Sequence, residues 1–262
     1  MRVRGIALTL TVLASVALAG DHMSSPRDTT RINLPALVLW AWDRDDDLRF
    51  IDTRDTAVAY LAATVILRGD GVFLAPRHNP LQLPDGTVRV AVAHVESDRA
   101  EPAVLNAAQM RRFIDVLAAL GSSAPQQVLQ VDFEALASQR AFFIEAVAGL
   151  RRRLPDAALS VTALASWCLT ESWTGRLAAD EVVPMLLRMG PDGRKVREHF
   201  LNGGDFRSAS CRTSLGVAAD ELPPALPAGR RIYVFSPRRW TAETYRTIRA
   251  RIRPWSYASL SD

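Results

Sequence analysis

Hydrophobic residues gather in eight short runs along the chain, and polar or helical stretches separate most of these runs. Short apolar runs bounded by turn residues are typical of buried strands. We expect strands at Ala36–Trp42, Val58–Leu67, Val88–Glu96, Val128–Glu134, Leu159–Trp167, Val182–Met189, Leu215–Ala219 and Ile232–Ser236. Strands that alternate with helices imply a parallel sheet, and eight of them predict a single (β/α)₈ TIM-barrel-like domain.

Apolar residues recur at three- and four-residue spacing between some of these strands. The helices predicted from this spacing are Asn106–Leu120, Ser138–Leu154, Arg194–Leu201 and Thr241–Ile252, the last with Thr241 as its N-cap. The region 50–86 fits the pattern least, because Gly71–Pro76 is either a hairpin strand or part of a βα unit. A doubly wound open sheet is the competing architecture, but no Gly-x-Gly-x-x-Gly follows a predicted strand.

The first residues of the chain resemble a secretory leader. Arg2 and Arg4 precede the apolar run from Ile6 to Leu18, and Ala17-Leu18-Ala19 fits a small-x-small cleavage site. Position 21 is Asp, so the cysteine that lipid anchoring requires is missing. We therefore expect a cleaved signal peptide at 1–19, a flexible tail at 20–33 and the barrel at 34–262. The mature protein should be periplasmic or secreted, without a membrane span.

Charge and cysteine content narrow the function. The 262 residues carry a formal charge of +4 with acidic and basic residues interspersed, so nucleic-acid binding has little support. We expect a monomer without a cofactor or metal, because the histidines show no ligand spacing. In an oxidising compartment the two cysteines, Cys168 and Cys211, favour a disulfide; two buried thiols are the alternative.

The candidate chemistry lies at the predicted strand ends, where α/β barrels place their catalytic groups. Asp132 and Glu134 alternate along one strand, so they share a face with Cα atoms ~7 Å apart. A pair of carboxylates suits glycoside hydrolysis, in which one protonated group assists the leaving oxygen. Two adjacent carboxylates also raise each other's proton affinity. We expect Glu134 to be the general acid and Asp132 to orient the acid or the substrate.

Other side chains at the strand ends suit a sugar ligand. Flat aromatic rings stack on sugar rings, while carboxylates and arginines bind hydroxyl groups. The candidate binding residues are Trp40, Trp42, Glu96, Trp167, Arg188 and Trp240. Each has a simpler structural interpretation: Trp40 could fill the barrel, and Asp132 or Glu96 could pair with Arg188. His94 is expected to be a hydrogen-bonded core residue, and Asp45-Asp46-Asp47 to be a solvated loop.

Several segments resemble an uncharacterised bacterial secreted family, the domain of unknown function 3142. They are LWAWDRDDDLRF (39–50), QVDFEA (130–135), SVTALASWC (160–168), VPMLLRMG (183–190) and YVFSPRRWT (233–241). More distantly, the chain is similar to chitinase-like glycoside hydrolase barrels, whose fourth strand carries Asp-x-x-Asp-x-Asp-x-Glu. The chain keeps Asp132 and Glu134 but has Gln127 and Gln130 at the first two acidic positions. This resemblance implies that Trp240 forms the floor of a sugar site.

Two classes of function remain compatible with these residues. The first is a glycoside hydrolase-like enzyme that acts on a glycan of the cell envelope or the environment. The second is a protein without catalytic activity. It either binds a glycan or peptide at the mouth, which is the open carboxyl end of the predicted barrel, or has a structural role. An open cleft favours a ligand-binding role, whereas a mouth sealed by side chains favours a structural one.

Overall fold

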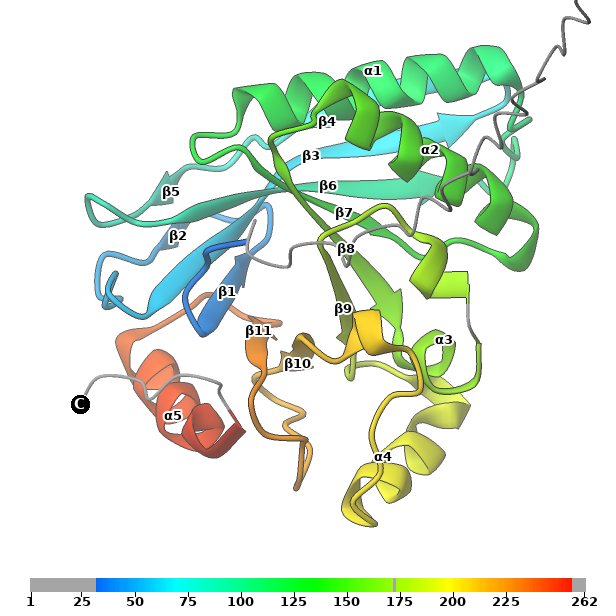
Figure 1. Ribbon diagram of the computed structural model, residues 1–262. Helices are drawn as coiled ribbons and strands as arrows, with labels where there is room; N and C mark the ends of the chain where they lie inside the picture. Colours follow the sequence, from blue (N-terminus) through cyan, green and yellow to red (C-terminus); the bar gives the residue numbers. More distant parts are fainter. Residues whose placement is uncertain (1–31, 172, 256–262) are drawn as a thin grey trace, which may run out of the picture.

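The computed structural model describes residues 32–171 and 173–255, and its centre is a closed barrel of eight parallel strands (Figure 1). The predicted signal peptide and most of the predicted tail lie outside the described residues. The barrel strands are β1 (Leu37–Ala41), β3 (Thr56–Arg68), β6 (Arg89–Ser97), β7 (Val128–Phe133), β8 (Ala158–Leu164), β9 (Glu181–Met185), β10 (Ser214–Ala218) and β11 (Arg231–Phe235). Strand β1 pairs in parallel with both β3 and β11, which closes the barrel and confirms the predicted fold.

The region 50–86, which fitted the predicted pattern least, contains a hairpin. Strand β4 (Gly71–Pro76) runs antiparallel to the second half of β3, where Ala63–Arg68 pair with it. Gly69 occupies the turn with a φ of +53°, a conformation that favours glycine. The hairpin alternative was therefore right for Gly71–Pro76.

Two very short strands, β2 (Asp46–Asp47) and β5 (Leu81–Gln82), form a separate parallel ribbon. The expectation of a solvated loop is wrong for Asp46, which is 1% exposed. Burial raises the pKa of Asp46, and the nearby guanidinium of Arg44 partly opposes this shift. The Nε atom of Arg44 lies 3.7 Å from Oδ2 of Asp46.

In the described part of the chain, five α-helices cover the barrel: α1 (Ala107–Ser123), α2 (Arg140–Arg153), α3 (Ala165–Thr170), α4 (Gly193–Leu201) and α5 (Ala242–Ile252). Thr241 caps α5 as predicted, because its hydroxyl accepts a hydrogen bond from the backbone N–H of Thr244 at 3.1 Å. Two predicted strands end three or four residues earlier than expected, β8 at Leu164 and β9 at Met185. The residues after β8 form α3, whose apolar side chains are buried like those of a strand, so hydrophobicity alone could not separate the two.

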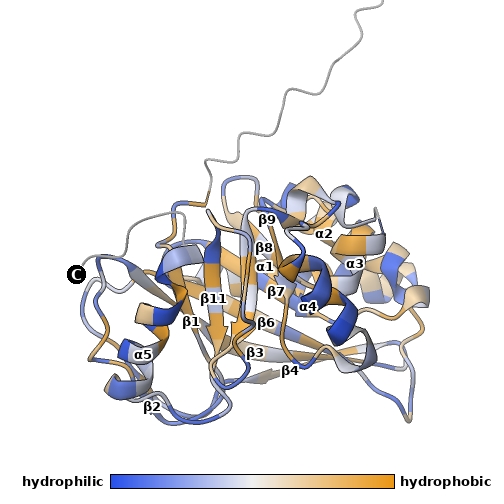
Figure 2. Ribbon diagram, turned by 90° about the horizontal axis from the view of Figure 1, so that it is seen from below, coloured by the Kyte–Doolittle hydropathy of each residue, from blue (hydrophilic) through white to orange (hydrophobic). Residues whose placement is uncertain are grey.

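Apolar residues form two layers on either side of the barrel wall. The inner layer includes Val38, Trp40, Val90, Val92 and Tyr233, which fill the barrel. The outer layer joins the opposite faces of the strands to the helices. Hydrophobic residues accordingly dominate the strands, while α4 carries mostly hydrophilic ones (Figure 2). Among the described residues, no helix has the length and apolarity needed to cross a membrane.

Cys168 and Cys211 form the predicted disulfide. Cys168 lies on α3, and Cys211 ends the 3₁₀ segment Ala209–Cys211 just before β10. The backbone N–H of Arg207 donates to the carbonyl of Cys168 at 3.1 Å, so the segment after α4 returns to α3. This return brings Cys211 into the outer layer beside α3, and both cysteines are fully buried there.

Candidate active site

Asp132 lies at the carboxyl end of the barrel and is held by neighbours on both sides. It is 7% exposed, and its strand β7 lies between β6 and β8 in the sheet. Its Oδ1 accepts a hydrogen bond from the Thr162 hydroxyl at 2.6 Å, and its Oδ2 lies 2.8 Å from Nδ1 of His94. Both carboxylate oxygens therefore have protein partners.

His94 joins Asp132 to the rim of the mouth. Its Nε2 lies 3.3 Å from Glu96 Oε1, and its ring centre lies 5.3 Å from that of Trp42. Burial alone would lower the pKa of His94, but the hydrogen bond to Asp132 and the charges of Asp132 and Glu96 outweigh it. The net effect raises the pKa above its ordinary value. The prediction that His94 is hydrogen-bonded is confirmed, and its side chain, 27% exposed, also reaches the mouth.

Glu134 follows β7 and is exposed. It lines a pocket of about 260 Å³ together with Ser166, Arg188 and apolar side chains that include Met185, Leu187 and Val196. Among the described residues, no hydrogen bond or ion pair joins Glu134 to Asp132, whose bonded partners are Thr162 and His94. This pocket lies below the ~300–1,000 Å³ typical of drug-sized ligands, so it suits a group of about one ring.

Arg188 lies in the same pocket but does not neutralise the candidate acids. Its Nη2 lies 2.9 Å from Asp220 Oδ2, and its Nη1 lies 3.5 Å from Glu221 Oε2. The suggested ion pair of Arg188 with Asp132 or Glu96 is therefore wrong. Arg188 remains half-exposed beside Glu134, where a ligand could reach it.

The four tryptophans near the predicted strand ends have different environments. Trp42 is half-buried, and its ring lies against that of His94. Trp40 and Trp240 are each 4% exposed, and the indole N–H of Trp240 donates to the carbonyl of Trp40 at 3.0 Å. Trp167 is equally buried on α3, where the centre of its ring lies 4.8 Å from that of Trp173. Burial leaves Trp40, Trp167 and Trp240 with almost no ring surface for a sugar.

A second polar network fills the barrel interior between the candidate site and the amino end of the barrel. The Trp40 indole donates to Gln130 at 2.7 Å, Gln130 donates to Ser160 at 3.1 Å, and the Ser160 hydroxyl donates to Glu181 at 3.0 Å. Tyr233 also donates to Glu181 at 2.7 Å. Burial, reinforced by the Glu181 carboxylate, raises the pKa of Tyr233 well above its ordinary value and keeps the phenol protonated.

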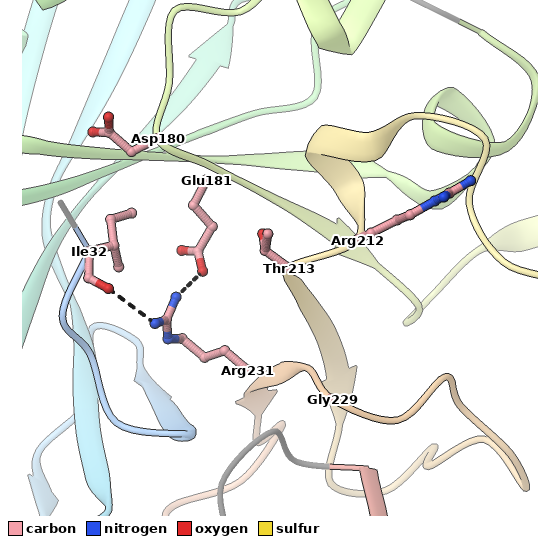
Figure 3. Close-up of a pocket in the computed structure, with 7 residues that line it drawn as sticks. All are labelled: Ile32, Asp180, Glu181, Arg212, Thr213, Gly229 and Arg231. Atoms are coloured by element: carbon pink, nitrogen blue, oxygen red, sulfur yellow. Dashed lines mark hydrogen bonds and ion pairs between the residues drawn. The ribbon is translucent and has the colours of Figure 1, made fainter. Parts of the chain in front are cut away.

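A pocket of about 300 Å³ lies where this network reaches the amino end of the barrel (Figure 3). Arg231 forms an ion pair there with Glu181, and it also donates to the carbonyls of Ile32 and Leu34 at 3.3 Å. Asp180 at the same pocket pairs with Arg151. Because its buried charges are already paired, we interpret this end as a structural plug.

Two members of the site escaped the sequence interpretation. Thr162 was not singled out, and His94 was expected only in the core. The sheet register places His94 directly opposite Asp132 on adjacent parallel strands, and this relationship decides their contact. Among the described residues, no group of three or more His, Cys, Asp or Glu side chains could hold a metal ion.

Comparison with known proteins gives no family assignment. No family model matches the chain, so the resemblance to the domain of unknown function 3142 is not supported, and no curated protein matches it. Among solved structures, the chain is similar to one titled "putative Chitinase A" from Streptomyces coelicolor. The identity is 10%, the TM-score is 0.49, and the match covers 82% of this chain and 94% of that one. The strand pairing itself, rather than this distant likeness, establishes the class as a (β/α)₈ barrel.

Proposed function

We propose that the protein is a glycoside hydrolase that acts on a glycan of the cell envelope or the environment. The observation that carries this proposal is Glu134, an exposed carboxylate in a ring-sized pocket at the carboxyl end of a (β/α)₈ barrel. Active sites of such barrels lie at this end. In its protonated form, Glu134 gives its proton to the glycosidic oxygen as the bond breaks, and a water molecule adds to the anomeric carbon and releases a proton, which restores the acid.

Asp132 has a positioning role in this proposal. Its two oxygens bind Thr162 and His94, so it holds the imidazole in place and favours the protonated ring. The two N–H groups of a protonated His94 face Asp132 and Glu96, so His94 holds the Glu96 carboxylate at the mouth, where that carboxylate accepts hydrogen bonds from sugar hydroxyls. Asp132 therefore acts on the substrate through His94 and Glu96.

The binding residues in this proposal are the three candidates that remain accessible. Trp42 is partly exposed beside His94, Glu96 is exposed at the end of β6, and Arg188 lines the pocket of Glu134. Trp42 provides a ring for stacking, while Glu96 and Arg188 bind hydroxyl groups. We do not assign Trp40, Trp167 or Trp240 to the ligand because of their burial.

The second candidate function is binding of a glycan or peptide without turnover. Two observations favour it: both Asp132 oxygens are engaged by the protein, and Glu134 has no second carboxylate bonded to it among the described residues. A barrel can keep a binding mouth without catalysis, because fold alone does not determine activity.

The proposal includes a location outside the cytoplasm. The Cys168–Cys211 disulfide supports an oxidising compartment, where such bonds persist. The leader-like segment at 1–19 lies outside the described residues, so the sequence alone supports its assignment. Cell fractionation of the full chain, with N-terminal sequencing of the mature protein, tests this location; intact Met1 in the cytoplasmic fraction would contradict it.

A panel of chromogenic glycosides and peptidoglycan digests tests the reaction. We expect the wild type to hydrolyse at least one substrate, and Glu134→Gln to lose about 10²–10⁴-fold in rate while still binding it. Glu145→Gln is the matched control, because Glu145 is an exposed carboxylate on α2, away from the mouth. Binding without turnover would establish the second function, and neither binding nor turnover would refute both.

A further inference from the structure

The barrel wall is higher on one side of the mouth than on the others. Strand β3 has 13 residues, but β1 pairs only with its first part, Thr56–Tyr60. Beyond that point, β4 takes the place of β1 and pairs with Ala63–Arg68. Figure 1 shows β4, β3 and β6 side by side beneath α1. The inward face of these strands therefore continues past the barrel.

A shift in the register between β3 and β6 determines which side chains of the raised wall point toward the inside of the barrel. Leu61 of β3 pairs with Val92, which faces the barrel interior, and Ala62 is then an extra residue in β3. An extra residue in one strand reverses the alternation of faces beyond it. Thr64 and Ile66 consequently share the face of His94 and Glu96, with which they pair.

The same rows extend to β4 and to the candidate site. Thr64 pairs with Ala75 on one side and with His94 on the other, and His94 pairs with Asp132. Ile66 pairs with Phe73 and Glu96 in the next row. Paired residues point to the same side of a sheet. We call the face made by Phe73, Ala75, Thr64 and Ile66 the ledge.

Phe73 gives the ledge an exposed aromatic ring. The residue as a whole is 46% exposed, and the guanidinium of Arg68 lies 4.5 Å from the centre of the Phe73 ring. The ring folds close over Gly71, where an added Cβ would lie 2.6 Å from Phe73 Cε2. On the opposite face, Gln109 of α1 donates to the carbonyl of Gly71 at 2.7 Å and anchors the hairpin.

We propose that the ledge is an extended binding subsite for a linear, uncharged glycan whose reacting bond lies at Glu134. This inference rests on the proposed function. It implies that the protein cleaves bonds inside a glycan chain and not only at the end of the chain. The strand order β4-β3-β6-β7-β8-β9 places the ledge on one side of Glu134 and the ring-sized pocket on the other. A chain that crosses the strands contacts both.

The dimensions and chemistry of this path fit an oligosaccharide better than a single sugar. Three strand spacings separate β4 from β7, a distance of ~14 Å at ~4.8 Å each. The pocket beside Glu134 holds about one ring, so the rest of a chain needs another surface. Phe73 supplies an aromatic platform that includes the Arg68 guanidinium beside its ring, and the exposed Glu96 supplies hydrogen-bond acceptors between the platform and the pocket.

The test compares Phe73→Ala with Leu74→Ala. Both residues are exposed on β4, at 46% and 49%, but they point to opposite faces of the strand. Probes are β-1,4-linked oligomers of glucose and of N-acetylglucosamine, with two and six sugars, titrated by calorimetry. We expect Phe73→Ala to weaken binding of the six-sugar probe about tenfold and to leave the two-sugar probe unchanged. Leu74→Ala should change neither.

A second variant, Gly71→Ala, keeps Phe73 but displaces its ring, and it should also weaken binding of the six-sugar probe. Thermal melts of all three variants confirm that the fold is retained. Equal effects of Phe73→Ala and Leu74→Ala, or equal losses for both probe lengths, would overturn the ledge and leave the proposed function intact. Absence of wild-type binding to both six-sugar probes would overturn the ledge, whereas the panel of glycosides and peptidoglycan digests decides the proposed function separately.

Discussion

Nδ1 of His94 lies 2.8 Å from Oδ2 of Asp132, across the adjacent parallel strands β6 and β7. This contact links a side chain that the sequence places in the core to the deeper of the two candidate acids. Its consequence is electrostatic, because Asp132 and Glu96 together overcome the burial of the imidazole and raise its pKa. The candidate site is therefore a histidine–carboxylate cluster beside a separate exposed carboxylate, Glu134.

The raised pKa of His94 predicts a pH-dependent contribution to stability. A group whose folded pKa exceeds its unfolded value, about 6.5 for histidine, stabilises the fold fully below that value. The contribution is lost as the pH rises through the folded pKa. We expect thermal melts of His94→Gln to fall below those of the wild type at pH 5.5, with the difference shrinking by pH 9. The exposed His78 provides a control, His78→Gln; a difference for His94→Gln that stays constant with pH would contradict the assignment.

Asp132→Asn should destabilise the protein more than Glu134→Gln does. The amide disrupts the hydrogen bonds to Thr162 and His94, and a buried polar group that loses its partner costs on the order of 1–3 kcal/mol. Glu134 is exposed, so its substitution should stay within about 0.5 kcal/mol. Urea unfolding of the two variants measures the difference. Equal midpoints would show that Asp132 does not anchor the site.

Arg231→Met should be strongly destabilising because it leaves Glu181 buried without its cation. Breaking a buried ion pair on one side costs roughly 3–5 kcal/mol. The double variant Arg231→Met with Glu181→Leu should recover part of this loss, because the uncompensated charge is gone. Arg188→Met is the control, since its exposed ion pairs contribute about 1 kcal/mol or less. Chemical unfolding measures these losses. Equal losses in the free energy of unfolding for Arg231→Met and Arg188→Met would argue against the structural plug.

Reduction of the Cys168–Cys211 disulfide should lower the free energy of unfolding by ~4 kcal/mol, from the chain entropy of a loop of 43 residues. Urea unfolding with and without a reductant measures this loss. The double variant Cys168→Ser with Cys211→Ser should be less stable than the oxidised protein and insensitive to the reductant. A wild type that responds no more than this variant would contradict the prediction.

The sequence by itself determined the order and type of the main elements. Apolar runs predicted all eight barrel strands, because strands buried between a barrel core and a helical layer are hydrophobic on both faces. Local chemistry also identified the cap at Thr241, which depends on residues within one turn of the helix. The even number of cysteines predicted the disulfide once an oxidising compartment was inferred.

Only the tertiary structure decided which side chains meet. Asp132 contacts His94 and Thr162 because three strands, far apart in sequence, align at one level, and that register is a property of the whole sheet. The burial of Trp240 depends on its contact with Trp40, 200 positions away. The extra residue Ala62 reverses the faces of β3 and places Thr64 beside His94. Hydrophobicity predicts that a residue is buried in a strand, but the long-range pairing of strands determines its neighbours.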